Sequence, residues 1–138
     1  FSLAFGSWCA QVVQIADTSA GIKLEKMWIA LDVGTAIDPS IIEAQAFSGA
    51  IYGLSAAMGQ EITFKNGRVE QSNFHDFDSM RIFQAPSFEV AVLESFHKMG
   101  GAGEVGVPPA APALANAIFA LTGKRIRSLP LSREVRFA

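Results

Sequence analysis

Residues 100–116 constrain the fold of this chain most, because they surround one acid, Glu104, with glycines and prolines. The glycines are Gly100, Gly101, Gly103 and Gly106, and prolines at 108, 109 and 112 lead into an alanine-rich run. Glycine lets the backbone adopt positive φ or approach a bulky neighbour closely, and proline is typical of a first helical turn. The pattern therefore predicts a constricted loop that leads into a helix, with Glu104 on the loop.

Glu104 has two interpretations when only the residues around it are considered. A carboxylate held on a constricted loop can act as a positioned proton acceptor. An acid just before a helix is also favoured by the helix dipole, by about 0.3–1 kcal/mol. Without further context the residues favour the dipole interpretation, and both stay open at this point.

Composition narrows the classes of protein to which the chain can belong. Its 138 residues are enough for one domain, and half of them are apolar, so we expect a packed core. A net charge of −2 without a basic patch argues against nucleic-acid binding, and no apolar run reaches the roughly 20 residues that span a bilayer. Cys9, the single cysteine, is expected to be a small buried residue.

The start of the sequence bears on domain organisation. Because a strand-like pattern begins directly at Phe1, we expect residues 1–138 to be a single C-terminal piece of a longer subunit.

The first half of the chain predicts a hairpin followed by a long helix. Residues 7–16 and 22–33 are rich in β-forming residues and flank a turn. Asp38-Pro39 is typical of a helix start, and Gly59 predicts that the helix ends at residue 58. The helix is apolar around most of its circumference, so we expect it to be buried on most sides.

Two glycines on this helix, Gly49 and Gly53, predict a groove. Each costs about 1 kcal/mol of helix propensity relative to alanine. The groove can admit another backbone or a ligand, and it can equally serve tight packing onto the sheet. The two interpretations are compatible and stay open.

The second half predicts shorter elements. Asn66-Gly67 is a strong hairpin signal between residues 61–65 and 68–70. The remaining predicted elements are a loop or short helical piece at 71–86, a well-buried strand at 87–95, a helix at 109–122 ending at Gly123, and a last strand or extended tail at 124–129. The predicted fold class is α+β, a mostly antiparallel sheet covered by two helices.

Three ordered stretches carry a family resemblance over nearly the whole chain. They are Ala30-Leu31-Asp32-Val33-Gly34 with Asp38-Pro39, Gln45, Gly49 and Gly53-Leu54-Ser55-Ala56-Ala57; Gln71-Ser72-Asn73-Phe74-His75-Asp76-Phe77 with Arg81 and Ala85-Pro86; and Gly101-Ala102-Gly103-Glu104-Val105-Gly106-Val107-Pro108-Pro109 with Thr122-Gly123-Lys124-Arg125. The sequence resembles the C-terminal region of the large, molybdenum-cofactor-binding subunit of the xanthine oxidase and aldehyde oxidase family. Within it, the isoquinoline 1-oxidoreductase β-subunit type is the most similar branch.

The resemblance implies an activity and a set of site residues. Members of this family hydroxylate a carbon of an N-heterocycle or an aldehyde with oxygen from water, at a molybdenum held by a pterin. The resemblance implies that Glu104 is the general base and that Gln45 hydrogen-bonds to the pterin. It also implies that Gly49 and Gly103 lie at the cofactor site, and it assigns no protein side chain as a metal ligand.

The resemblance also implies partners. It implies a molybdenum–pterin cofactor in the complete complex, iron–sulfur clusters on a small partner subunit, and a heterocycle or aldehyde as substrate. We expect the isolated piece to be inactive and to self-associate through apolar surface.

One departure from the family motif lies next to Glu104. The broader family has Gly-Glu-Pro-Pro at this place, whereas here Val105-Gly106-Val107 separates Glu104 from the prolines. This spacing fits the isoquinoline branch.

Several interpretations remain beside this one. A non-catalytic binding or assembly module that kept the fold is the alternative function, and the sequence is compatible with the bacterial cytoplasm or periplasm. His75 and Asp76 resemble a catalytic pair, but a structural hydrogen-bonding role in a polar loop is favoured. Arg81 is expected to tie this loop down through Asp76 or Asp78.

Overall fold

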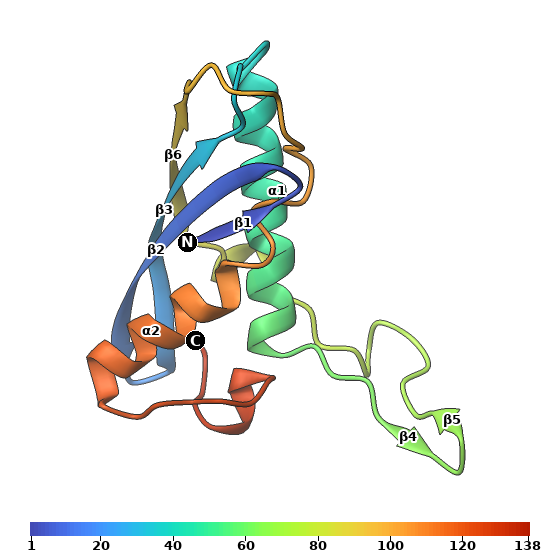
Figure 1. Ribbon diagram of the computed structural model, residues 1–138. Helices are drawn as coiled ribbons and strands as arrows, with labels where there is room; N and C mark the ends of the chain where they lie inside the picture. The colour runs from blue at the N-terminus through green and yellow to red at the C-terminus, as the bar shows by residue number, and fades with distance from the viewer.

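The chain folds into one four-stranded mixed sheet with two helices on the same face, which confirms the predicted α+β class. The structure is a computed structural model that describes residues 1–138. The strands lie in the order β1-β2-β3-β6, and Figure 1 shows the helices α1 and α2 beside them. The main elements are β1 (Ser2–Ala4), β2 (Ser7–Thr18), β3 (Gly21–Asp32), α1 (Pro39–Met58), β6 (Ser87–Leu93) and α2 (Ala110–Thr122).

The pairing of the strands follows from how they are connected. Short turns join β1 to β2 and β2 to β3, and both pairs are antiparallel. β6 pairs with β3 in parallel, since α1 supplies part of the long crossover that a parallel pair requires. The sheet is therefore antiparallel in two of its three pairings, as predicted.

The core lies between the sheet and the two helices. Along β2 the buried positions alternate from Ser7 to Val13, while Trp8 and Val12 between them are exposed. This period of two places one face of the sheet in the core and leaves the other face uncovered within this chain. The largest fully buried apolar side chains are Met27, Ile29, Leu31, Leu54, Leu114, Ile118 and Leu131.

Helix α1 has the predicted bounds but not the predicted burial. The Asp38 carboxylate caps it by accepting from the backbone N–H groups of Ser40 (3.0 Å) and Ile41 (3.2 Å). The expectation that α1 is buried on most sides is wrong, because Ile41 and Tyr52 are exposed on its outer side. The sheet, α2 and the chain just before α2 pack against the other side of the helix and leave Ile41 and Tyr52 uncovered.

Helix α2 ends as predicted and leads into a C-terminal tail. Gly123 takes the left-handed conformation at φ 71°, and its N–H donates to the Phe119 carbonyl at 2.8 Å. Residues 124–129 form no strand, so of the two predicted alternatives the extended tail is the correct one. After a short 3-10 turn, η2 (Leu131–Arg133), the tail returns to the sheet, where Ile22 donates to the Arg136 carbonyl. Neither helix has the length and apolar character of a membrane span.

The remaining elements lie at the edges. Strand β6 ends at Leu93 and is only partly buried, so the prediction of a well-buried strand at 87–95 is wrong; β6 is an edge strand with β3 as its single neighbour. The predicted hairpin is confirmed as β4 (Phe64–Lys65) and β5 (Arg68–Val69), with positive φ at Asn66 and Gly67. It projects away from the sheet (Figure 1). Residues 71–86 form a loop with one 3-10 turn, η1 (Ile82–Gln84).

Candidate functional site

The glycine loop, defined here as residues 100–109, connects the β6 side of the sheet to α2 and lies beside α1 (Figure 1). Its first part is fixed beside the sheet by two backbone bonds. Gly100 N–H donates to the carbonyl of Val33, just after β3 (3.0 Å), and Gly101 N–H donates to the carbonyl of Phe5, between β1 and β2 (2.8 Å). A Cβ on Gly100 would lie 2.2 Å from the Ser7 Oγ. None of the loop's glycines adopts positive φ. At Gly100 glycine is therefore required for close approach rather than for an unusual backbone conformation.

The second part of the glycine loop fills the groove on α1. A Cβ on Gly49 would lie 3.3 Å from Gly106 Cα, and a Cβ on Gly53 would lie 2.6 Å from both Ala110 Cβ and the Val107 carbonyl oxygen. The groove predicted from the two glycines therefore exists, and backbone of the same chain occupies it. The cofactor-binding role expected of Gly49 stays a prediction, and the contact shown for this buried residue is with the loop.

Gln11 on β2 holds the glycine loop from the other side. Its Nε2 donates to the Gly106 carbonyl at 2.7 Å, and the side chain is buried. Its Oε1 is buried without a hydrogen-bond partner. Sequence reasoning missed Gln11, although a polar residue at an alternating core position between Cys9 and Val13 was the available signal.

Glu104 is exposed, and its side chain forms no hydrogen bond or ion pair in the structure. Its own carbonyl accepts from Val107 N–H at 3.0 Å, which closes a turn in the middle of the glycine loop. Helix α2 begins at Ala110 and has no acid in its first turn. The dipole interpretation of Glu104 therefore loses its basis, because the effect falls off within the first turn of a helix.

Gln45 lies beside the residue that precedes Glu104. Its amide is exposed on α1 and takes part in no hydrogen bond of the structure. A Cβ on Gly103 would have the Gln45 Nε2, at 3.8 Å, as its one neighbour within 4 Å. The structure thus brings Gln45, Gly103 and Glu104 together at one place on the surface. Gly49 is buried on the same helix, against the backbone of Gly106.

The side chains of this chain do not form a metal site of their own. No group of three or more His, Cys, Asp and Glu residues has the arrangement needed to hold a metal ion. Burial raises the pKa of the Cys9 thiol to about 11, against a smaller opposing effect of the neighbouring Gln11 side chain. Cys9 is therefore a protonated, buried thiol at neutral pH, as its apolar sequence context predicts.

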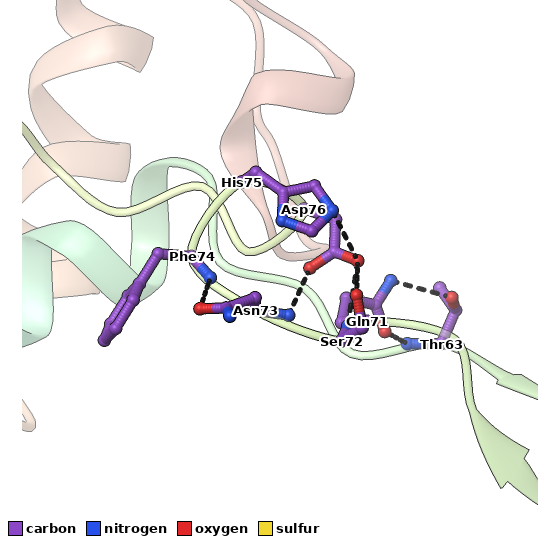
Figure 2. A network of polar contacts seen from close by, with 7 residues as sticks. All are labelled: Thr63, Gln71, Ser72, Asn73, Phe74, His75 and Asp76. Atoms are coloured by element: carbon purple, nitrogen blue, oxygen red, sulfur yellow. Dashed lines mark hydrogen bonds and ion pairs between the residues drawn. The ribbon is translucent and has the colours of Figure 1, made fainter.

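A second polar cluster, the Asp76 loop, comprises residues 71–76 (Figure 2). The Asp76 carboxylate accepts from the backbone N–H groups of Ser72 (2.8 Å) and Asn73 (2.9 Å) and from Ser72 Oγ (2.9 Å). These bonds, with that from Asn73 first, lower the pKa of Asp76 to about 2. The Gln71 amide accepts from Thr63 N–H and donates to Thr63 Oγ1, which joins the loop to the chain before β4.

These contacts support the structural interpretation of the Asp76 loop. His75 Nε2 lies 3.6 Å from the Asp76 carboxylate and remains largely exposed, so it adds little to the bonds from the backbone. The prediction that Arg81 ties the loop down through Asp76 or Asp78 is wrong, because Arg81 forms no ion pair. Its backbone N–H donates instead to Gln84 Oε1 at 3.0 Å.

Comparison with known proteins gives a family and relatives. The sequence profile of the molybdopterin cofactor-binding domain matches residues 1–86. The β-subunit of isoquinoline 1-oxidoreductase from Brevundimonas diminuta is 36% identical over 110 residues, which are 80% of this chain and 14% of that protein. The large subunit of nicotine 6-hydroxylase from Paenarthrobacter nicotinovorans is 27% identical over 115 residues, 79% of this chain and 14% of that protein. The chain thus spans only a small part of the length of these relatives.

Solved structures share the fold. Quinoline 2-oxidoreductase from Pseudomonas putida 86 superposes with a TM-score of 0.72 at 20% identity, over 80% of this chain and 15% of that one. The Cu,Mo-CO dehydrogenase superposes with a TM-score of 0.66 at 30% identity, over 78% of this chain and 15% of that one.

Proposed function

The chain belongs to the molybdopterin cofactor-binding domain family, and from this premise we propose that it is part of a molybdenum-dependent hydroxylase to which it contributes the general base, Glu104. The observation that carries the proposal is that the Gln45 amide lies 3.8 Å from where a Cβ on Gly103 would stand, in the residue before Glu104. Neither the Gln45 amide nor the Glu104 carboxylate takes part in a hydrogen bond of the structure. The proposed substrate is an N-heterocycle or an aldehyde, hydroxylated at carbon with oxygen from water. The chain is similar to isoquinoline 1-oxidoreductase and nicotine 6-hydroxylase, and both this similarity and the family resemblance support such a substrate.

The residues present fit a metal that arrives with its own organic ligand. The chain offers no protein ligand set for a metal ion, but the free Gln45 amide can donate and accept at once, which suits the edge of a pterin ring. Gly103 leaves space where a side chain would otherwise stand between Gln45 and a ligand. When bound, the molybdenum–pterin group supplies a water-derived oxygen to the substrate carbon and takes up the electron pair.

Glu104 suits the removal of a proton at this place. A general base must be ionised and must have no strong partner that already occupies its lone pairs. Its carboxylate has no basic side chain or backbone donor attached to it. The backbone that carries it is fixed on both sides, by Gly101 to the sheet and by Gly106 to Gln11. The carboxylate thus has no partner, while the backbone that carries it is held in place. General base catalysis requires both.

Replacement of Glu104 in the complete enzyme tests the proposal. Glu104→Gln keeps the shape of the side chain and removes the proton acceptor, so turnover should fall by roughly 10²–10⁴-fold. Molybdenum content, measured by mass spectrometry of the metal, should not change. Glu43→Gln is the matched control, because it removes the same charge from an exposed, unpaired acid on α1. Full turnover in Glu104→Gln would contradict the assignment of the base.

The uncovered face of the sheet favours interaction with other polypeptide. Trp8, Val12 and Leu93 are large apolar residues exposed on strands, and they are joined on α1 by Ile41 and Tyr52. We propose that other parts of the enzyme cover these surfaces, that a separate subunit carries iron–sulfur clusters, and that the chain alone is inactive. A non-catalytic assembly module would use the same surfaces.

Self-association of the isolated chain follows from this exposure. Sedimentation velocity should show dimers or larger species whose fraction rises with concentration. Val12→Lys, which places a charge on the uncovered face, should shift the distribution toward monomer. A chain that is monomeric at every concentration would contradict the expectation.

A further inference from the structure

We infer that Gln11 is a positioning residue that fixes the turn on which Glu104 stands. The inference rests on the proposed function for its catalytic consequence, whereas the hold of Gln11 on the glycine loop stands on geometry alone. Gln11 does not touch the proposed reacting atoms. It acts through the backbone carbonyl of Gly106, two residues after Glu104.

The hydrogen bond of Gln11 joins two distant parts of the chain. Its Nε2 and the Gly106 carbonyl oxygen are 2.7 Å apart and belong to residues 95 positions apart. No other side chain hydrogen-bonds to residues 100–109 in the structure. Because Val107 N–H closes a turn on the Glu104 carbonyl at 3.0 Å, the peptide that Gln11 holds lies inside that turn. Fixing this peptide therefore fixes the direction in which the Glu104 side chain leaves the backbone.

The opposite side of Gly106 is fixed by α1. A Cβ on Gly106 would lie 3.2 Å from the Ala46 carbonyl oxygen and 3.4 Å from Ala50 N. The peptide is thus held between the backbone of α1 and the amide of Gln11. Without the bond from Gln11, packing against α1 remains, but the carbonyl loses its one specific partner on the β2 side.

The amide at position 11 serves the glycine loop more directly than it serves the core. The residue is only 9% exposed, and its Oε1 has no hydrogen-bond partner. An apolar side chain of similar shape would remove this unpaired acceptor, but it would leave the carbonyl of the buried Gly106 without its donor. The hydrogen bond of the amide thus satisfies a group of the glycine loop, at the expense of an unpaired acceptor on β2.

Gln11→Met tests the inference, because methionine keeps the length of the side chain and cannot donate. Hydrogen–deuterium exchange on the chain without cofactor should show roughly tenfold faster exchange of the Val107 amide, whose hydrogen bond to the Glu104 carbonyl closes the turn. Exchange in β3 should not change. Gln14→Met is the matched control: it replaces a glutamine of the same strand that is exposed and bonds to Glu25 rather than to the loop. In the complete enzyme, kcat of Gln11→Met should fall about tenfold through misplacement of Glu104, with KM unchanged.

The outcomes separate this inference from the proposed function. Unchanged exchange at Val107 overturns the inference, whatever the Glu104 variant does. Faster exchange with unchanged kcat, in an enzyme that Glu104→Gln inactivates, overturns it as well. If Glu104→Gln retains full turnover while Gln11→Met loosens the loop, the proposed function fails and the hold of Gln11 on the loop is supported. Should circular dichroism show Gln11→Met to be unfolded, Gln11→Asn replaces it, because this shorter amide keeps polarity but does not reach Gly106.

Discussion

Two loops of this chain carry an exposed acid, and they use it in opposite ways. In the Asp76 loop the carboxylate is the organising group, because it accepts from Ser72 and Asn73 and holds the surrounding backbone. In the glycine loop the carboxylate of Glu104 holds nothing. Other elements fix that loop, through backbone bonds to the sheet, the groove on α1 and the amide of Gln11.

The comparison shows how an acid is kept available for chemistry. Bonds from backbone donors stabilise the ionised form of Asp76 and lower its pKa to about 2, which makes it a poor proton acceptor. The glycine loop instead takes its shape from its glycines and from the amide of Gln11. The carboxylate of Glu104 is therefore not needed to hold the loop and remains free to accept a proton. The difference lies in which groups supply the contacts of the loop, since both acids are exposed.

Filling the groove on α1 should displace the glycine loop and leave the Asp76 loop unchanged. A Cβ at residue 53 would lie 2.6 Å from Ala110 Cβ and from the Val107 carbonyl oxygen. Gly53→Ala should therefore lower the free energy of unfolding by about 1–3 kcal/mol through overpacking. This loss should outweigh the gain of about 1 kcal/mol from replacing a helical glycine by alanine. Urea denaturation followed by circular dichroism measures the change.

Gly49→Ala is the matched control on the same helix. Its Cβ would meet Gly106 and Val107 at 3.3–3.4 Å, a distance that small shifts of the loop can accommodate. Its stability should stay within about 1 kcal/mol of the parent, because the overlap and the helix propensity oppose each other. Equal stability of the two variants would show that the glycine loop is not clamped at Gly53.

The sequence predicted the elements whose signals are local. Asp38-Pro39 and Gly59 gave the bounds of α1, Asn66-Gly67 gave the β4–β5 hairpin, and Gly123 gave the end of α2. Each of these depends on a cap or a turn formed within a few residues. Such signals do not need the rest of the chain in order to be read.

Burial and the support of the site were harder to predict. α1 and β6 were expected to be well covered because they are apolar, but coverage depends on which other elements this chain brings to them. The role of Gln11 was missed because its partner lies 95 positions away in the sequence. No local sequence pattern predicts such a bond. The alternation of β2 marked position 11 as a core position, yet the identity of its partner required the fold.

Replacement of Asp76 should have a smaller effect than Gly53→Ala, confined to the Asp76 loop. Asp76→Asn replaces one accepting oxygen by an NH₂ group, so the backbone donors of Ser72 and Asn73 lose part of their acceptor. Proteolytic cleavage within residues 71–76 should become roughly tenfold faster, because the loop opens more often. Asp78→Asn is the control, since its carboxylate takes part in no hydrogen bond of the structure. Exchange in the glycine loop should be the same in both variants, and a change there would show that the two loops are coupled.

The stability of the Asp76 loop should also depend on pH, because the ionised carboxylate of Asp76 holds it together. The pKa of Asp76 is lowered from its ordinary value of 3.8 to about 2, so the native loop binds the proton less readily than the unfolded chain does. The stabilisation is therefore complete above about pH 4 and is lost as pH falls through about 2. NMR shifts of the Ser72 and Asn73 amides should report this transition, and Asp76→Asn should abolish it. The glycine loop, whose shape depends on no bond to a carboxylate, should show no corresponding step, and a step of equal size there would remove the distinction between the two loops.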